Sequence, residues 1–191
     1  ELTGSFDKIV SIEMIEAVGH QYLDTFFRKC SQLLQPDGAM LLQAITMADQ
    51  RFEQHVRTVD FIKRHIFPGS CLPSVARMSE AVAEVTDFRI QHLRDIGQHY
   101  ARTLAEWARR FAANEKAVRD QGFSDRFIRK WEFYLAYCEA GFAERYISNV
   151  QLLLTKPGYR ESAVADAAPT RYVDQSESSE APHTAGSLAT L

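Results

Sequence analysis

The sequence predicts an α/β fold in which two parallel strands are joined by a helix, followed by a helical insertion. Residues 6–12 and 39–45 are short apolar runs with the composition of buried strands. Between them, residues 19–34 carry apolar side chains at helical spacing, and a Pro-Asp-Gly turn follows at 36–38. A strand, a helix and a strand in this order form a right-handed unit with parallel strands.

The next hundred residues continue the pattern. Residues 49–65 are charged and amphipathic, which predicts a helix, and residues 66–73 form a loop with two prolines. Ser74 is a good N-cap for a helix that runs to about Val85. Residues 88–96 alternate as a strand, residues 100–119 and 124–145 have helical periodicity, and residues 146–156 read as a final strand. We therefore expect one folded part, 1–156, and a disordered tail, 157–191, rich in Ala, Ser, Thr and Glu.

The composition excludes several classes of protein. The chain has 191 residues, is 46% hydrophobic and has a net charge of -3. The tail accounts for this charge, and a body with balanced charges argues against binding to nucleic acid. No apolar run is long enough to span a membrane, no signal peptide is evident, and three cysteines are too few for a disulfide framework. We therefore expect a cytoplasmic location. The histidines and cysteines lack the spacing of metal ligands, so no metal site is predicted.

Two acids, Glu13 and Glu16, follow the first strand directly. In an open α/β sheet, ligands bind in the crevice at the carboxyl ends of the strands, which predicts a site there. Glu16 could instead cap the helix that follows, since acids favour helix N-termini. No glycine-rich nucleotide loop occurs in the sequence. Since such a loop belongs to the first half of a sheet of this kind, we expect the chain to be the second half of a longer fold.

Five stretches together resemble the cyclopropane-fatty-acyl-phospholipid synthase family, which includes the mycolic acid cyclopropane synthases. They are FDKIVSIEMIEAVG, LLQPDGAMLLQAI, HIFPGSCLPS, GQHYARTLAEW and YLAYCEAGFAERYISNVQLLL, and they extend over residues 6–156. The resemblance implies a Rossmann-like class I methyltransferase fold that uses S-adenosylmethionine. On this basis the chain would hold strands 4 to 7 and a helical insertion, with the cofactor-loop strands upstream of Glu1.

The resemblance also implies a reaction. The family transfers the sulfonium methyl group to the cis double bond of an unsaturated phospholipid acyl chain, and a bound bicarbonate takes a proton from the resulting carbocation as the cyclopropane closes. Some relatives leave a methyl branch or a hydroxyl group instead. A lipid substrate implies peripheral contact with the inner face of the membrane. The oligomeric state, including a homodimer, stays open.

Individual residues match the family's site. Glu16 matches the acid that holds bicarbonate, Tyr100 the tyrosine that hydrogen-bonds the same ion, and Ile45 a position that contributes its backbone. Gln43 stands where cyclopropane synthases usually carry a histidine, and an amide can donate a hydrogen bond but does not titrate near neutral pH. Cys138 matches a cysteine sometimes assigned as a nucleophile.

A pocket that must handle a carbocation should be apolar and lined by aromatic faces. Phe67, Tyr100, Trp107, Tyr134 and Tyr137 are the candidates, and Glu13, where the family often has glycine, is given no role. Other interpretations remain open. Tyr100 and Cys138 could be ordinary core side chains, and Gln43 favours a related methyltransferase that makes a methyl-branched lipid or methylates a small molecule. The absent glycine-rich loop favours a non-catalytic chain that needs a partner chain.

Overall fold

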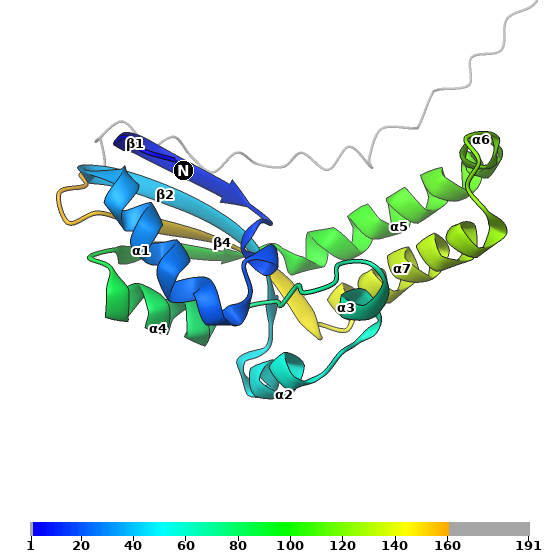
Figure 1. Ribbon diagram of the computed structural model, residues 1–191, viewed down its shortest axis with the longest axis horizontal. Coiled ribbons are helices and arrows are strands. Elements are labelled where there is room, and N and C mark those ends of the chain that lie inside the picture. Colours follow the sequence, from blue (N-terminus) through cyan, green and yellow to red (C-terminus); the bar gives the residue numbers. More distant parts are fainter. Residues whose placement is uncertain (1, 161–191) are drawn as a thin grey trace, which may run out of the picture. The chain divides into compact units, whose positions relative to one another are not determined.

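The computed structural model describes residues 2–160, and residues 161–191 of the expected tail lie outside this range (Figure 1). The sheet has four strands, β1 (Phe6–Ile12), β2 (Leu34–Met47), β3 (Arg89–Asp95) and β4 (Ile147–Thr155). Their order is β1-β2-β4-β3. β1 and β2 are parallel, and β4 is antiparallel to both of its neighbours. The predicted parallel unit is therefore present, and the last strand inserts between β2 and β3.

Two helices cover one face of the sheet, α1 (Leu23–Leu33) and α4 (Val75–Val85) (Figure 1). The main core lies between them and the central strands, where Phe27, Met40, Met78 and Leu154 are fully buried. Ser74 caps α4 as expected, because its hydroxyl accepts the Arg77 N–H at 3.2 Å. The apolar faces of α1 and α4 thus pack against the apolar face of the sheet.

The segment after β2 departs from the prediction of one helix over 49–65. It forms two short helices, α2 (Phe52–Arg57) and α3 (Phe61–His65), after a turn of 3-10 helix, Asp49–Arg51. The break has a local cause, since the Asp60 side chain accepts the Lys63 N–H at 2.9 Å and caps a new helix. The apolar period continues across this break, whereas the cap depends on the single side chain of Asp60.

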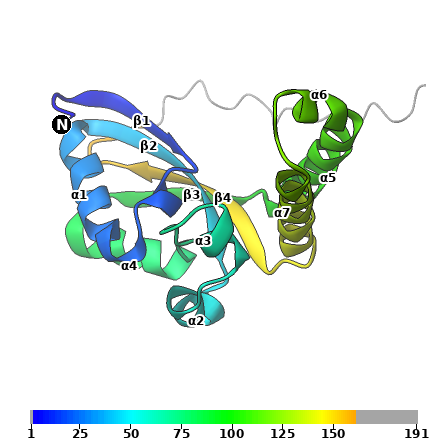
Figure 2. The ribbon, with the colours of Figure 1, turned by 45° about the vertical axis from the view of Figure 1, so that its right-hand side comes forward.

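The helical insertion consists of α5 (Gly97–Ala113), α6 (Glu115–Asp120) and α7 (Asp125–Ala143). The prediction of one helix over 100–119 was wrong at Asn114, where α5 ends and α6 begins. α5 and α7 pack on each other around Leu104, Leu135 and Phe142, a second small core that Ile45 and Ile147 of the sheet also contact (Figure 2). α7 leads directly into β4, so this pair of helices is anchored at the end of the sheet that carries the carboxyl end of β2.

The chain remains attached to the sheet beyond residue 156. The Gly158 N–H donates to the Pro36 carbonyl at 3.0 Å, and a Cβ at Gly158 would lie 2.6 Å from that oxygen. Only glycine fits this approach.

Candidate functional site

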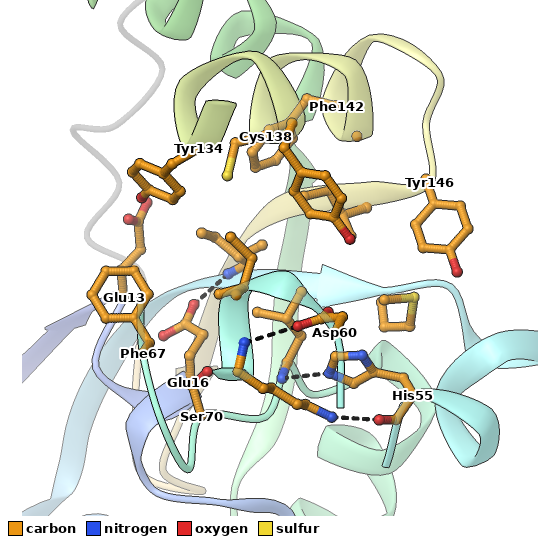
Figure 3. Close-up of a pocket in the computed structure, with 18 of the residues that line it drawn as sticks. Glu13, Glu16, His55, Asp60, Phe67, Ser70, Tyr134, Cys138, Phe142 and Tyr146 are labelled. Atoms are coloured by element: carbon orange, nitrogen blue, oxygen red, sulfur yellow. Dashed lines mark hydrogen bonds between the residues drawn. The ribbon is translucent and has the colours of Figure 1, made fainter. Parts of the chain in front are cut away.

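A cavity of about 610 Å³ lies between the loop after β1, the carboxyl end of β2, the α2–α3 segment and α7. In Figure 3, Tyr134, Cys138 and Phe142 come from α7 on one side, and Glu13, Glu16 and His55 lie on the opposite side. Most of its lining side chains are apolar or aromatic. A deep, largely apolar cavity with a few convergent polar groups is the usual form of a small-molecule site.

Glu16 lies in a short 3-10 helix, Ile15–Ala17, and its side chain is buried. The Ile45 N–H donates to Glu16 Oε1 at 2.6 Å, while Glu16 Oε2 is buried with no hydrogen-bond partner among the described residues. Burial raises the pKa of Glu16, the N–H groups of Glu16 and Ile45 oppose this rise, and the nearby charge of Glu13 adds to it. The half-satisfied carboxyl group is suited to sharing a proton with a ligand in the cavity.

Glu13 has the unusual backbone angle φ +51° for a residue that is not glycine. Its N–H donates to the Gln43 carbonyl at 2.9 Å, which holds the loop against β2. Glu13 Oε1 accepts three hydrogen bonds, from Gln43 Nε2 at 2.9 Å, from Asn149 Nδ2 at 2.7 Å and from the Tyr100 hydroxyl. One carboxylate oxygen thus collects donors from β2, β4 and α5.

The donors around Glu13 are themselves held in place. Gln151 Nε2 donates to Gln43 Oε1 at 2.9 Å, which orients the Gln43 amide so that its nitrogen faces Glu13. Asn149 is fully buried on β4. Burial and the neighbouring Glu13 raise the pKa of Tyr100, so its hydroxyl keeps its proton and remains a donor at neutral pH. The polar groups form a preorganised network of donors around one acid.

The α7 wall carries Tyr134, Tyr137 and Cys138. The rings of Phe67 and Tyr134 meet edge to face, with centroids 6.3 Å apart. Burial raises the pKa of Tyr134 to about 12 and the pKa of Cys138 to about 11. Cys138 is therefore a neutral thiol at physiological pH, which makes it a poor nucleophile.

His55 and Lys63 lie at another part of the lining and are engaged by the protein itself. The Leu72 N–H donates to His55 Nε2 at 3.1 Å, and burial lowers the pKa of His55. Lys63 Nζ donates to the carbonyls of Thr58, at 3.0 Å, and His55. These contacts fix the α2–α3 segment that closes the cavity.

The structure brings most of the predicted site residues together. Those that line the cavity directly are Glu16, Ile45, Phe67, Tyr134, Tyr137 and Cys138. Gln43 and Tyr100 connect to it through Glu13. Trp107 does not line it, because it lies further along α5 with 49% of its surface exposed.

Sequence reasoning missed the roles of Glu13 and Asn149. A signal was available for Asn149, since Asn149, Gln151 and Gln43 are amides within otherwise apolar strands and must find partners when buried.

The residues present fit the two expected small molecules unequally. The unpartnered Glu16 Oε2 suits a bicarbonate that shares a proton, but the side-chain donors of Gln43 and Tyr100 already bind Glu13. For S-adenosylmethionine, the described residues offer the exposed carboxyl end of β1, where ligands of open α/β sheets bind. Ile12 and Met14 flank Glu13 at the carboxyl end of β1 and expose 61% and 49% of their surfaces.

No helix among residues 2–160 is long and apolar enough to cross a membrane.

Comparison with known proteins identifies the family. The model of the mycolic acid cyclopropane synthetase family matches residues 1–152. The tuberculostearic acid methyltransferase of Mycobacterium tuberculosis is 38% identical over 83% of this chain, which spans 37% of that protein. The cyclopropane-fatty-acyl-phospholipid synthase of Escherichia coli is 32% identical over 82% of this chain, which spans 39% of that protein. The chain thus spans less than half the length of these two relatives.

The solved structures agree with the sequence relatives. A mycolic acid cyclopropane synthase in complex with SAH and CTAB superposes with a TM-score of 0.72 at 32% identity, over 82% of this chain and 57% of that one. The cyclopropane synthase MmaA2 of Mycobacterium tuberculosis gives a TM-score of 0.71 at 30% identity, over 81% and 57%. The expected class I methyltransferase fold is confirmed, and the chain belongs to the mycolic acid cyclopropane synthetase family.

Proposed function

We propose that the chain forms the lipid-acceptor part of an S-adenosylmethionine-dependent enzyme that methylates the cis double bond of an unsaturated phospholipid acyl chain. The observation that carries this proposal is the cavity itself, an apolar and aromatic space with two carboxyl groups, Glu13 and Glu16, in its wall. An alkene offers no polar handle, so its site must be apolar. A cationic transition state in such a site gains from fixed negative charge and aromatic faces.

The proposed reaction gives a role to the aromatic side chains and to the carboxyl groups that line the cavity. As the methyl–sulfur bond breaks and a carbon–carbon bond forms, positive charge develops on the neighbouring carbon of the acyl chain. The faces of Phe67, Tyr134 and Tyr137 and the carboxyl groups stabilise that charge, and the apolar lining disfavours water that would capture the cation. Loss of a proton then closes a three-membered ring or leaves a new double bond.

A base must take that proton. The family resemblance implies bicarbonate, held by Glu16, Gln43, Tyr100 and the backbone of Ile45, although in this chain Gln43 and Tyr100 donate to Glu13 and the Ile45 N–H donates to Glu16. Glu16 Oε2 is the observation that supports a bound donor, because it is a buried acceptor with no hydrogen-bond partner among the described residues. The neutral Cys138 thiol is not needed for a reaction of this kind.

A second product is also supported. Gln43 replaces the histidine expected of cyclopropane synthases, and the relative with 38% identity is called a methyltransferase rather than a cyclopropane synthase. If the proton leaves from a chain carbon beside the cation instead of from the new methyl group, the product is a branched alkene.

Peripheral contact with the membrane follows from the substrate. The mouth region carries Phe67 and Tyr137, which expose 53% and 40% of their surfaces, beside the basic residues of α3. Aromatic and basic side chains together suit an anionic lipid surface.

The function is tested by incubating the full encoded protein with methyl-labelled S-adenosylmethionine and vesicles of monounsaturated phospholipid. Label in the acyl chains supports methyl transfer, and nuclear magnetic resonance of the product separates a ring from a branch. Glu16→Gln should lower kcat by about 100-fold. Glu53→Gln, an exposed change on α2, should leave kcat unchanged. If the wild-type protein binds neither S-adenosylmethionine nor lipid, a non-catalytic role takes its place.

A further inference from the structure

The three donors around Glu13 converge as they would on a bound anion. Gln43 Nε2 and Asn149 Nδ2 lie 2.9 Å and 2.7 Å from Glu13 Oε1, and the Tyr100 hydroxyl donates to the same atom. No positively charged side chain is among these partners, so hydrogen bonds alone balance the charge of this oxygen. Three donors on one oxygen are suited to a carboxylate anion and leave no donor position for a second anion at that point.

We propose that the Glu13 carboxylate occupies the anion position expected for bicarbonate and is itself the base that removes the proton from the methylated cation. This inference rests on the proposed methyl transfer to an alkene. It makes Glu13 a catalytic residue and makes Gln43, Asn149 and Tyr100 the residues that position it.

The backbone supports this role. Glu13 adopts φ +51°, a conformation that costs a non-glycine residue free energy, and its N–H donates to the Gln43 carbonyl. A glycine at this position would adopt the angle without strain and leave the three donors free. The chain therefore accepts strain at this position to present a carboxylate, and Glu13 lines the cavity.

The proton transfer balances without another reactant. One C–H bond of the cation breaks, and its electron pair forms either the third bond of the ring or a carbon–carbon double bond. The proton passes to Glu13 Oε2, which accepts no hydrogen bond from the described residues, whereas Oε1 already holds three. A carbocation is a very strong acid, so a weak base is sufficient if it is correctly placed. The proton then leaves to water when product departs.

Glu16 has a different part in this arrangement. Its buried carboxyl group is bound by the Ile45 N–H, and burial together with the charge of Glu13 raises its pKa. Two adjacent carboxyl groups are more easily accommodated when only one is ionised. Glu13 Oε1 holds three donors, and Glu16 has the burial that favours its protonated form.

The first test measures binding of ¹³C-labelled bicarbonate to the full encoded protein by nuclear magnetic resonance, since Glu13 and its three donors all lie in this chain. We expect no binding by the wild-type protein and saturable binding by Glu13→Gly, in which the donors are exposed. Glu13→Gln fills the same space with an amide and should bind none. Binding to the wild-type protein as strong as to Glu13→Gly would overturn the proposal.

The second test uses the full encoded protein in lipid methylation, with buffers freed of carbon dioxide. The wild type should be equally active with and without bicarbonate. Glu13→Gly should lose about 100-fold in kcat without bicarbonate and recover at least about tenfold with bicarbonate or formate, and Glu13→Gln should lose as much without recovery. A wild type that requires bicarbonate would overturn the proposal. If no variant methylates lipid, the proposed function fails. The binding test then decides by itself whether the Glu13 carboxylate or bicarbonate occupies the anion position.

Discussion

Glu16 Oε1 lies 2.6 Å from the backbone nitrogen of Ile45, although the two residues are 29 positions apart in the chain. The contact exists because β1 and β2 are parallel neighbours, with Ile12 paired to Gln43, so that the chain leaving β1 passes the end of β2. The other Glu16 oxygen stays buried without a partner. This half-satisfied acid has a measurable consequence for stability.

Glu16→Gln should make the free energy of unfolding less sensitive to rising pH. The pKa of Glu16 is raised by burial above its ordinary value of 4.5, so the folded state holds this proton more tightly than the unfolded state does. Stability from this group is therefore full below pH 4.5 and is lost as the pH rises through the folded-state pKa. Urea unfolding followed by tryptophan fluorescence should show the variant gaining stability relative to wild type from pH 4.5 upward. A constant difference would contradict the raised pKa.

His55→Gln should make the stability of the protein less sensitive to falling pH. Burial and the charge of Lys63 lower the pKa of His55 below its ordinary 6.5, while Asp60 opposes them. The unfolded chain then takes up the proton first, so the free energy of unfolding falls as the pH drops below 6.5 toward the lower folded-state pKa. His55→Gln can keep an acceptor for the Leu72 N–H without titrating. The free energy of unfolding of this variant should change less than that of wild type between pH 6.5 and 5. An equal dependence on pH in both proteins would contradict the lowered pKa of His55.

Cys138 should react slowly with iodoacetamide at neutral pH. Its pKa of about 11 means that about one molecule in 10,000 carries the thiolate at pH 7. The alkylation rate, measured by peptide mass spectrometry, should rise about tenfold per pH unit until the pH approaches 11. Cys138→Ser should keep methyl transfer within about threefold of wild type. A rate that levels off near pH 7 would instead indicate an activated thiolate.

Gly97→Ala should disturb the site from a distance. A Cβ at Gly97 would lie 2.3 Å from Ser148 Oγ and 3.1 Å from Ser148 Cα, on the strand that carries Asn149. Overpacking of this kind costs about 1–3 kcal/mol of stability, and it should push α5, and with it Tyr100, away from Glu13. Ala105→Gly, on an exposed part of the same helix, measures the propensity difference between Ala and Gly, which acts in the stabilising direction in Gly97→Ala. Unchanged or increased stability of Gly97→Ala would show that the contact with Ser148 is relieved without cost.

The sequence was sufficient for the β1–α1–β2 unit because apolar periodicity is a local signal. The turn expected at residues 36–38 was wrong, because these residues lie within β2, where its pairing with β1 shifts register. The rule that ligands bind at the carboxyl ends of strands predicted a site at Glu13 and Glu16, and the family resemblance added Ile45 to it. The break before Asp60 was missed because a periodic apolar pattern continues across it, while the cap depends on one side chain. A hydrophobic period cannot decide such a boundary.

Trp107 and Glu13 show a different limit. Helical spacing places Trp107 on one face of α5 but does not reveal how far the helix extends beyond the cavity. Glu13 acquires its partners from three separate elements, and its positive φ depends on the hydrogen bond to β2. Neither can be obtained from the residues next to it, because tertiary packing determines both.

The hydrogen bonds of Glu13 also bear on the order in which the molecule is assembled. Its partners Gln43, Tyr100 and Asn149 are 30, 87 and 136 residues away along the chain. Closing such long loops costs entropy that only cooperative packing repays, so contacts of this kind form late in folding. During synthesis, the carboxylate must wait for Asn149 to leave the ribosome before its last partner exists. The hydrogen bonds of Glu13 to Gln43, Tyr100 and Asn149 are thus complete only when the whole sheet has formed.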